Sequence, residues 1–105
     1  MSVKMLNQKN YDAEINGPGL KVIKFGADWC GPCRMIAPVL EGLTKKHADV
    51  GIFEVNVDEN PELSMKFGVR GIPAVFFMKN GQVVDSFAGF RGESEIESKI
   101  VSLNK

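Results

Sequence analysis

Segments with the pattern of β-strands alternate with segments that have the periodicity of helices, and this alternation constrains the fold most strongly. Apolar runs predict strands over residues 3–6, 20–27, 50–57, 74–78 and 83–88. Helical spacing and capping residues predict four helices, which lie after Asn7, over residues 32–47, from Pro61 to a stop at Gly68, and over residues 93–103. The order β-α-β-α-β-α-β-β-α favours a three-layer α/β/α fold, with a central mixed sheet flanked by helices on both faces.

Turn and connection rules add two expectations about the sheet. Asn80 and Gly81 lie between two apolar runs, and an Asn-Gly pair in that setting predicts a β-hairpin. Right-handed crossovers place the strand at 20–27 centrally, next to the strand at 50–57. A central strand is covered on both faces, so side chains on both of its faces should be at least partly buried.

The composition is typical of one soluble domain. The chain has 105 residues, which suits a single domain spanning residues 1–105, and its 44% hydrophobic residues argue against disorder. Its 13 Lys and Arg residues balance 13 Asp and Glu residues, so it lacks the basic surface expected of a nucleic-acid-binding protein. No apolar run approaches the ~20 residues of a membrane span, and residues 1–9 lack the apolar core of a signal peptide. We therefore expect a cytoplasmic monomer that binds neither nucleic acid nor membranes.

The two cysteines, Cys30 and Cys33, lie where the strand at 20–27 gives way to a helix. Two cysteines exclude a disulfide scaffold and a four-thiolate metal site built from this chain alone. At a helix start, Cys-x-x-Cys spacing places the Cα atoms roughly 5–6 Å apart, within the range that a disulfide spans. The helix N-terminus favours Cys30 as the attacking thiolate and the more buried Cys33 as the resolving thiol. Gly31 leaves the Cys30 sulfur open to a partner, and Pro32 occupies a position where its missing N–H costs nothing.

Two other interpretations of the cysteine pair stay open at this point. The cysteines are unreactive core residues, or they form half of a zinc site shared with a partner chain. Unreactive core cysteines rarely bracket Gly-Pro at a helix start, and such a zinc site needs two more ligands. His47 is a poor third ligand because it lies far along the helix, where we expect a solvated side chain. A redox-active dithiol without a metal or a bound organic cofactor is the favoured interpretation.

Residues 27–38, with the sequence ADWCGPCRMIAP, resemble the active-site segment of the thioredoxin family. Residues 55–61, 67–73 and 79–81 are similar to family segments in order and spacing, and the likeness extends over nearly the whole chain. The resemblance implies the thioredoxin fold and a protein-disulfide reductase, in which Cys30 forms a mixed disulfide with a protein substrate and Cys33 resolves it. It also implies electron transport from a flavin-dependent thioredoxin reductase. The Gly-Pro pair between the cysteines is typical of the reducing members.

The resemblance further implies a surface where disulfide-containing protein substrates dock. The Ile72–Pro73 segment matches a loop whose X-Pro bond is cis in the family and which faces the dithiol. The backbone of Ile72 is then expected to pair with an extended substrate segment. An ordinary proline at a strand entry is the alternative interpretation of Pro73. The implied docking surface consists of Trp29, Gly71, Ile72, Pro73 and Gly89.

Three positions depart from the family pattern. Lys24 stands where most thioredoxins have a buried Asp, and Glu54 stands where the family tends to have a Lys. An unpaired buried ammonium is costly, so we expect Lys24 and Glu54 to form an inward-facing ion pair beneath the dithiol. Three roles then stay open: a protonated Lys24 favours the thiolate forms of the cysteines, a neutral Lys24 acts as a base, or Glu54 accepts the proton. A fourth alternative is that the Lys24 side chain extends to water and has no chemical role. Gly26 replaces a Trp found in many relatives, which suggests a bulge or a close backbone approach.

Two rival functions remain open. One is a thiol oxidase or isomerase of the same fold in an exported compartment, against which the Gly-Pro pair and the composition of residues 1–9 argue. The other is a redox-silent binding subunit that docks a larger partner through the surface around Trp29 and Pro73. Reduction of insulin disulfides separates the reductase from the binding subunit.

Overall fold

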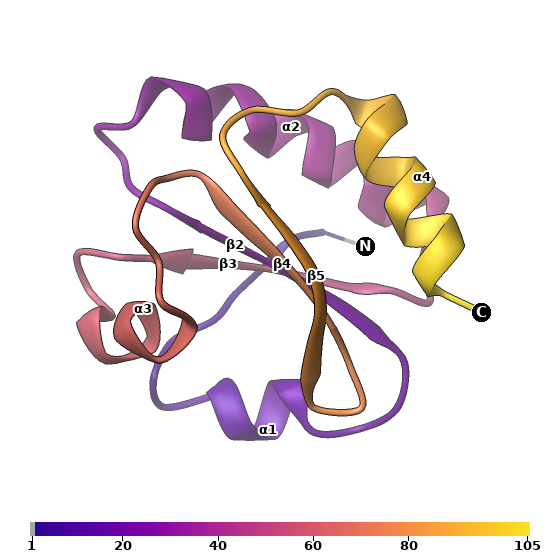
Figure 1. The fold of residues 1–105 in the computed structure, drawn as a ribbon, viewed down its shortest axis with the longest axis horizontal. Helices are drawn as coiled ribbons and strands as arrows, with labels where there is room; N and C mark the ends of the chain where they lie inside the picture. The colour runs from indigo at the N-terminus through magenta and orange to yellow at the C-terminus, as the bar shows by residue number, and fades with distance from the viewer. Residues whose placement is uncertain (1) are drawn as a thin grey trace.

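The computed structural model describes residues 2–105, which contain five strands and four helices in the predicted order (Figure 1). The strands are β1 (Lys4–Met5), β2 (Leu20–Gly26), β3 (Gly51–Asn56), β4 (Ala74–Lys79) and β5 (Gln82–Ala88). The helices are α1 (Tyr11–Ile15), α2 (Gly31–Lys46), α3 (Pro61–Phe67) and α4 (Glu93–Leu103). None of these helices is both long enough and apolar enough to cross a membrane.

The five strands form one mixed sheet in the order β1-β3-β2-β4-β5. β3 pairs in parallel with β1 and with β2, whereas β4 pairs antiparallel with β2 and with β5. Helices α2 and α4 cover one face of the sheet, and α1 and α3 cover the other (Figure 1). The predicted three-layer arrangement is therefore confirmed, as is the central place of β2 beside β3.

Alternate residues of β2 belong to two separate cores, because successive side chains of a strand point to opposite faces. Leu20 and Val22 pack with the apolar residues of α2 and α4. Ile23 and Phe25 pack with the apolar residues of α1 and α3. All four side chains are fully buried, so the strand that leads into the cysteine segment is fixed from both sides.

The hairpin predicted at Asn80 and Gly81 joins β4 to β5. Both residues have positive φ, 55° for Asn80 and 80° for Gly81. Two positive φ values at the centre of a two-residue turn match the twist of the flanking strands, and Asn-Gly adopts them at the lowest steric cost.

The start of the first helix differs from its prediction. The sequence predicts a helix capped by Asn7, but α1 begins only at Tyr11. The Asn7 side chain accepts hydrogen bonds from the backbone N–H groups of Lys9 and Asn10, while the Asn10 side chain accepts one from the N–H of Asn7. These local bonds hold the backbone in turns, because Asn side chains compete with helical hydrogen bonding.

Candidate functional site

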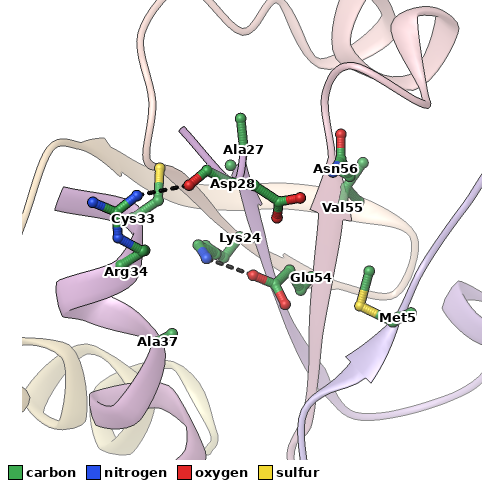
Figure 2. Close-up of a pocket in the computed structure, with 11 residues that line it drawn as sticks. Met5, Lys24, Ala27, Asp28, Cys33, Arg34, Ala37, Glu54, Val55 and Asn56 are labelled. Carbon is green, nitrogen blue, oxygen red and sulfur yellow. Dashed lines mark hydrogen bonds and ion pairs between the residues drawn. The ribbon is translucent and has the colours of Figure 1, made fainter. Parts of the chain in front are cut away.

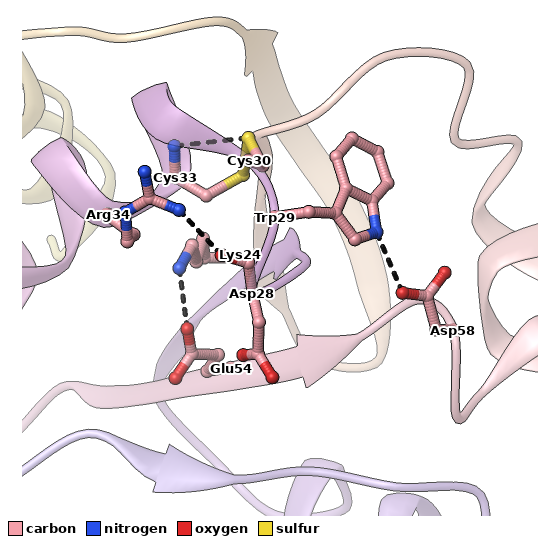
Figure 3. Close-up of a disulfide and its surroundings, with 8 residues drawn as sticks. All are labelled: Lys24, Asp28, Trp29, Cys30, Cys33, Arg34, Glu54 and Asp58. Atoms are coloured by element: carbon pink, nitrogen blue, oxygen red, sulfur yellow. Dashed lines mark hydrogen bonds and ion pairs between the residues drawn. A yellow bond between two sulfur atoms is a disulfide. The ribbon is translucent and has the colours of Figure 1, made fainter.

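The two cysteines lie at the junction between β2 and α2 (Figure 3). Cys30 is the N-cap residue of α2, with φ −92° and ψ 111°, and its sulfur accepts a hydrogen bond from the backbone N–H of Cys33 at 3.2 Å. Pro32 lies in the first turn, where a backbone N–H has no partner within the helix. The Cys30 sulfur thus occupies the position where a helix N-terminus stabilises negative charge.

Cys30 and Cys33 form a disulfide, so the structure represents the oxidised state. Their Cα atoms lie 5.3 Å apart, as the one-turn spacing predicts. Cys33 is 1% exposed and Cys30 is 5% exposed, which agrees with the expected order of burial.

The Cys30 sulfur is nevertheless less open than the sequence suggests. Ala27 lies in the same buried cluster as the two cysteines, and Ile72 packs against that cluster. Ile72 is more than forty positions away along the chain, so sequence spacing gives no sign of this cover. Only 5% of the Cys30 surface is left exposed.

Trp29 is 68% exposed, and its indole N–H donates a hydrogen bond to the Asp58 carboxylate at 2.9 Å (Figure 3). Asp58 follows β3, and β2 and β3 are parallel, so both strands deliver their following loops to the same edge of the sheet. Asp58 is not among the residues predicted for the site, although its place directly after a strand parallel to β2 is a usable signal. This bond orients the exposed indole beside the disulfide.

A second contact that the sequence analysis missed holds the cysteine segment from the helix side. The Arg34 guanidinium donates a hydrogen bond to the backbone carbonyl of Asp28 at 2.7 Å. It therefore ties the first turn of α2 to the loop that precedes it. No sequence pattern indicates this bond, because its acceptor is a backbone atom.

The residues expected to form the docking surface come from three segments. The Ile72–Pro73 peptide bond is cis, and Ile72 packs against the cluster that holds both cysteines. The Gly89 N–H donates a hydrogen bond to the Pro73 carbonyl at 2.7 Å, which joins the end of β5 to this loop. Gly71 precedes Ile72 and is exposed. Ile72 therefore lies directly beside the disulfide, while Gly89 supports the loop through Pro73.

Lys24 and Glu54 are register partners on the parallel strands β2 and β3. The Lys24 ammonium and a Glu54 carboxylate oxygen lie 2.5 Å apart, and their side chains point toward one another (Figure 3). Lys24 is only 3% exposed, which contradicts the alternative in which its stem carries the ammonium to water. The Glu54 side chain is 34% exposed, so the pair has one buried and one partly solvated member.

A cavity of about 370 Å³ lies beside the ion pair, between the sheet and the first turns of α2 (Figure 2). Lys24, Glu54 and Cys33 line it together with Asp28 and Arg34. The cavity therefore brings Cys33 and the ion pair into one space, on the side of the sheet that α2 covers.

The structure differs from expectation at His47. Its Nε2 lies 2.8 Å from a Glu97 carboxylate oxygen, and its side chain is only partly exposed. The expected solvated side chain is thus wrong, because α4 packs against the end of α2 and supplies the carboxylate. Within residues 2–105, no group of three or more His, Cys, Asp or Glu side chains is arranged to hold a metal ion.

Comparison with known proteins places this site in a family. The family model described as Thioredoxin matches residues 2–102. The thioredoxin of Alicyclobacillus acidocaldarius is 38% identical over 93% of this chain and 94% of its own length, and that of Bacillus subtilis is 37% identical over 95% and 96%. A chain from a structural study of the thiol resolving mechanism in yeast mitochondrial 1-Cys peroxiredoxin via glutathione and thioredoxin systems superposes with a TM-score of 0.86, at 29% identity over 96% of this chain and 95% of its own length. Likeness of this extent, in sequence and in fold, shows that the chain belongs to the thioredoxin family and is a thiol–disulfide oxidoreductase that reduces protein disulfides.

Proposed function

We propose that reduction of a protein disulfide proceeds through a mixed disulfide on Cys30. The Cys30 thiolate attacks one sulfur of the substrate disulfide, forms a bond with it and expels the other substrate sulfur as a thiolate. Cys33 then attacks the Cys30 sulfur as a thiolate, forms the Cys30–Cys33 bond and expels the second substrate sulfur. Two electrons pass to the substrate, and the protein reaches the oxidised state that the structure represents.

The observation that carries this assignment is the position of Cys30 as the N-cap of α2. Its sulfur accepts the Cys33 N–H, and the same N–H stabilises a thiolate after the disulfide opens. Cys33 lies one turn inside the helix with less exposed surface, which suits attack on a neighbouring sulfur rather than on an incoming protein. A redox-silent binding subunit has no need of two bonded sulfurs at this position, so that alternative is not favoured.

Substrate proteins dock on the surface formed by Trp29 and the loop before β4. Exposed indole is the kind of anchor that dominates protein interfaces, and the partly buried Ile72 packs against the cluster that holds the disulfide. An extended segment on either side of a substrate cysteine then runs along this loop and pairs with the Ile72 backbone. Gly71 and Gly89, which have no side chains, leave room for that segment.

The protein works as an electron carrier in the cytoplasm, as a monomeric single domain without a bound cofactor. A thioredoxin reductase restores the dithiol after each turnover, and the family membership supports a partner of this class. The balanced charge of the chain supports partners recognised by shape and apolar contact rather than by a strong overall field.

Insulin reduction tests this function directly. The wild-type protein is expected to accelerate precipitation of insulin B chains with dithiothreitol as the reductant, and also with NADPH and a bacterial thioredoxin reductase. Acceleration with dithiothreitol alone supports the dithiol chemistry but contradicts the proposed reductase partner. No acceleration with either reductant contradicts the proposed reaction sequence.

Replacing Trp29 by alanine is expected to raise KM for insulin about tenfold while changing kcat less, because the indole anchors the substrate and does not take part in bond exchange. Reduction of insulin at several insulin concentrations provides both constants. Met65→Ala removes another exposed apolar side chain from α3 and is the matched control, with no expected change. A large fall in kcat for Trp29→Ala with KM unchanged contradicts a docking role.

A further inference from the structure

A buried cation lies behind the disulfide. Among the buried residues of the described chain, Lys24 is the one charged side chain. It projects from β2 on the face that α2 covers, two residues before the end of the strand. Burying an ammonium is costly, and the ion pair with Glu54 offsets this cost only in part because Glu54 itself is partly solvated. The fold thus holds a positive charge beneath the disulfide, in a space that Cys33 also lines.

The close approach of Lys24 to Cys33 depends on Gly26. A Cβ atom at Gly26 would lie 3.0 Å from the Lys24 Cε atom and 3.1 Å from the Cys33 sulfur. The end of the Lys24 side chain and the Cys33 sulfur therefore both lie close to the position that a Cβ atom of residue 26 would take. In the glycine that position holds only a hydrogen atom. A side chain at position 26 would crowd both atoms, so the glycine leaves room for the side chains of Lys24 and Cys33.

The other charged groups around this space come from three segments and lie nearer to solvent. Asp28 follows β2, Arg34 and Glu41 belong to α2, and Glu54 belongs to β3. The Arg34 guanidinium bonds the Asp28 carbonyl, and the Glu41 carboxylate accepts the Val3 N–H at 3.1 Å. The neighbouring strands β1 and β4 contribute neutral residues, Met5 opposite Glu54 and Val75 opposite Lys24. Lys24 is thus the buried cation of this space, which the Cys33 side chain also lines.

We propose that the Lys24 ammonium, held by Glu54 and admitted by Gly26, stabilises the thiolate of Cys33 when the disulfide is open. This proposal rests on the roles proposed above for the two cysteines. The Cys33 thiol loses its proton to solvent in the cavity, and the resulting thiolate attacks the Cys30 sulfur of the mixed disulfide. The Cys30–Cys33 bond forms, the bond between Cys30 and the substrate breaks, and the substrate sulfur leaves as a thiolate. Lys24 takes no part in the bond exchange, so it is a positioning residue that acts through Cys33.

The sign of this effect follows from elementary electrostatics. A cation close to a thiol favours the charged form and lowers the pH at which the thiol ionises. The low-dielectric surroundings of a buried cation strengthen the effect. Glu54 opposes it, but its greater exposure lets solvent screen its charge more effectively. The net expectation is a Cys33 thiol that ionises more readily with Lys24 than without it.

Titration of Cys33 as a single thiol tests the proposal. In a Cys30→Ser background, Cys33 is the one remaining cysteine of the chain, and thiolate absorbance at 240 nm reports its ionisation without any reagent having to reach it. Adding Lys24→Met is expected to raise the titration midpoint by about one pH unit or more, which corresponds to about a tenfold smaller ionised fraction below the midpoint. Lys24→Arg, which keeps a cation at the position, is expected to restore most of the shift.

Lys21→Met is the matched control for these titrations. Lys21 lies on the same strand and carries the same charge, but its side chain belongs to the opposite face and bonds the Pro18 carbonyl. The Lys21→Met substitution changes the net charge of the protein by the same amount as Lys24→Met, and it is expected to leave the Cys33 midpoint unchanged. A shift as large in Lys21→Met as in Lys24→Met overturns the proposal, because the effect is then one of overall charge.

Glu54→Gln provides a second test that does not depend on the folding of Lys24→Met. Glutamine removes the negative charge that opposes thiolate formation, while its amide oxygen can still accept a hydrogen bond from the Lys24 ammonium, so the Cys33 midpoint is expected to fall. A higher Cys33 midpoint in Glu54→Gln overturns the proposal. Equal Cys33 midpoints with and without the Lys24→Met substitution overturn it as well. Insulin reduction by the protein with both cysteines separates failure of this proposal from failure of the proposed function. If that protein reduces insulin but Lys24 has no effect on the Cys33 titration, only the role of Lys24 is contradicted.

Discussion

Replacing Cys30 by serine is expected to lower insulin reduction by more than about 100-fold, because Cys33, the other thiol of the chain, is not at the N-cap of α2 and is almost fully buried. Replacing Cys33 by serine should also stop turnover, but at a later step. Cys30 still attacks the substrate in that variant, and the mixed disulfide persists because no second thiol resolves it. Insulin turbidity measures the loss of turnover for both variants.

Mass spectrometry separates the two roles. After incubation with a disulfide-containing peptide, the Cys33→Ser protein is expected to carry one peptide half on Cys30, whereas the Cys30→Ser protein remains largely unmodified. Unfolding both proteins before incubation provides the control, because both single cysteines then become accessible and should react similarly. An adduct on Cys33 of the folded Cys30→Ser protein, with none on Cys30 in the other variant, reverses the assignment.

Phe25→Ala is expected to destabilise the oxidised protein by about 3–5 kcal/mol. The Phe25 ring is fully buried, and its centroid lies 5.1 Å from that of Phe67 and 5.5 Å from that of Phe76. Its removal leaves a cavity between β2 and the α3 side of the molecule. For a chain of this length the loss corresponds to a fall in Tm of more than about 12 °C. Urea denaturation followed by circular dichroism measures the free energy of unfolding.

The control for this prediction is Phe90→Ala, which removes the same kind of ring from an exposed position. Its expected effect on the free energy of unfolding is within about 0.5 kcal/mol. A loss below about 1 kcal/mol for Phe25→Ala contradicts the account of β2 as a strand fixed from both faces. Such a result also weakens the claim that β2 holds the cysteine segment rigidly.

The sequence predicted the fold well wherever local signals and the hydrophobic pattern agree. The last helix was predicted over 93–103 and is found there, since acidic residues fill its first turn and its apolar positions face the sheet. The hairpin at Asn80 and Gly81 was predicted for the same reason, because only the local backbone decides it. The start of the first helix was predicted too early because the side chains of Asn7 and Asn10 accept hydrogen bonds from each other's backbone N–H groups. The same residues can cap a helix or stabilise a turn, and the sequence does not show which of the two forms.

The site was predictable as far as it depends on spacing along one element or on strand register. One helical turn brings Cys30 and Cys33 together, and the pairing of parallel strands brings Lys24 opposite Glu54. The remainder depends on loops that return from elsewhere in the chain. The cover over Cys30 comes from Ile72, and the partner of Trp29 is Asp58. The family resemblance implies that the Ile72 loop faces the dithiol, and the place of Asp58 after a strand parallel to β2 is a signal, but the contacts themselves depend on how the whole sheet packs.

The difference in reactivity between the two thiols is the central claim, and partial alkylation measures it most directly. The fully reduced protein is treated at neutral pH with less than one equivalent of iodoacetamide, and the labelled peptides are quantified by mass spectrometry. The helix N-terminus activates Cys30 and the burial of Cys33 shields it from the reagent, so we predict that Cys30 is labelled at least about ten times faster. Equal labelling of both cysteines, or faster labelling of Cys33, contradicts this account.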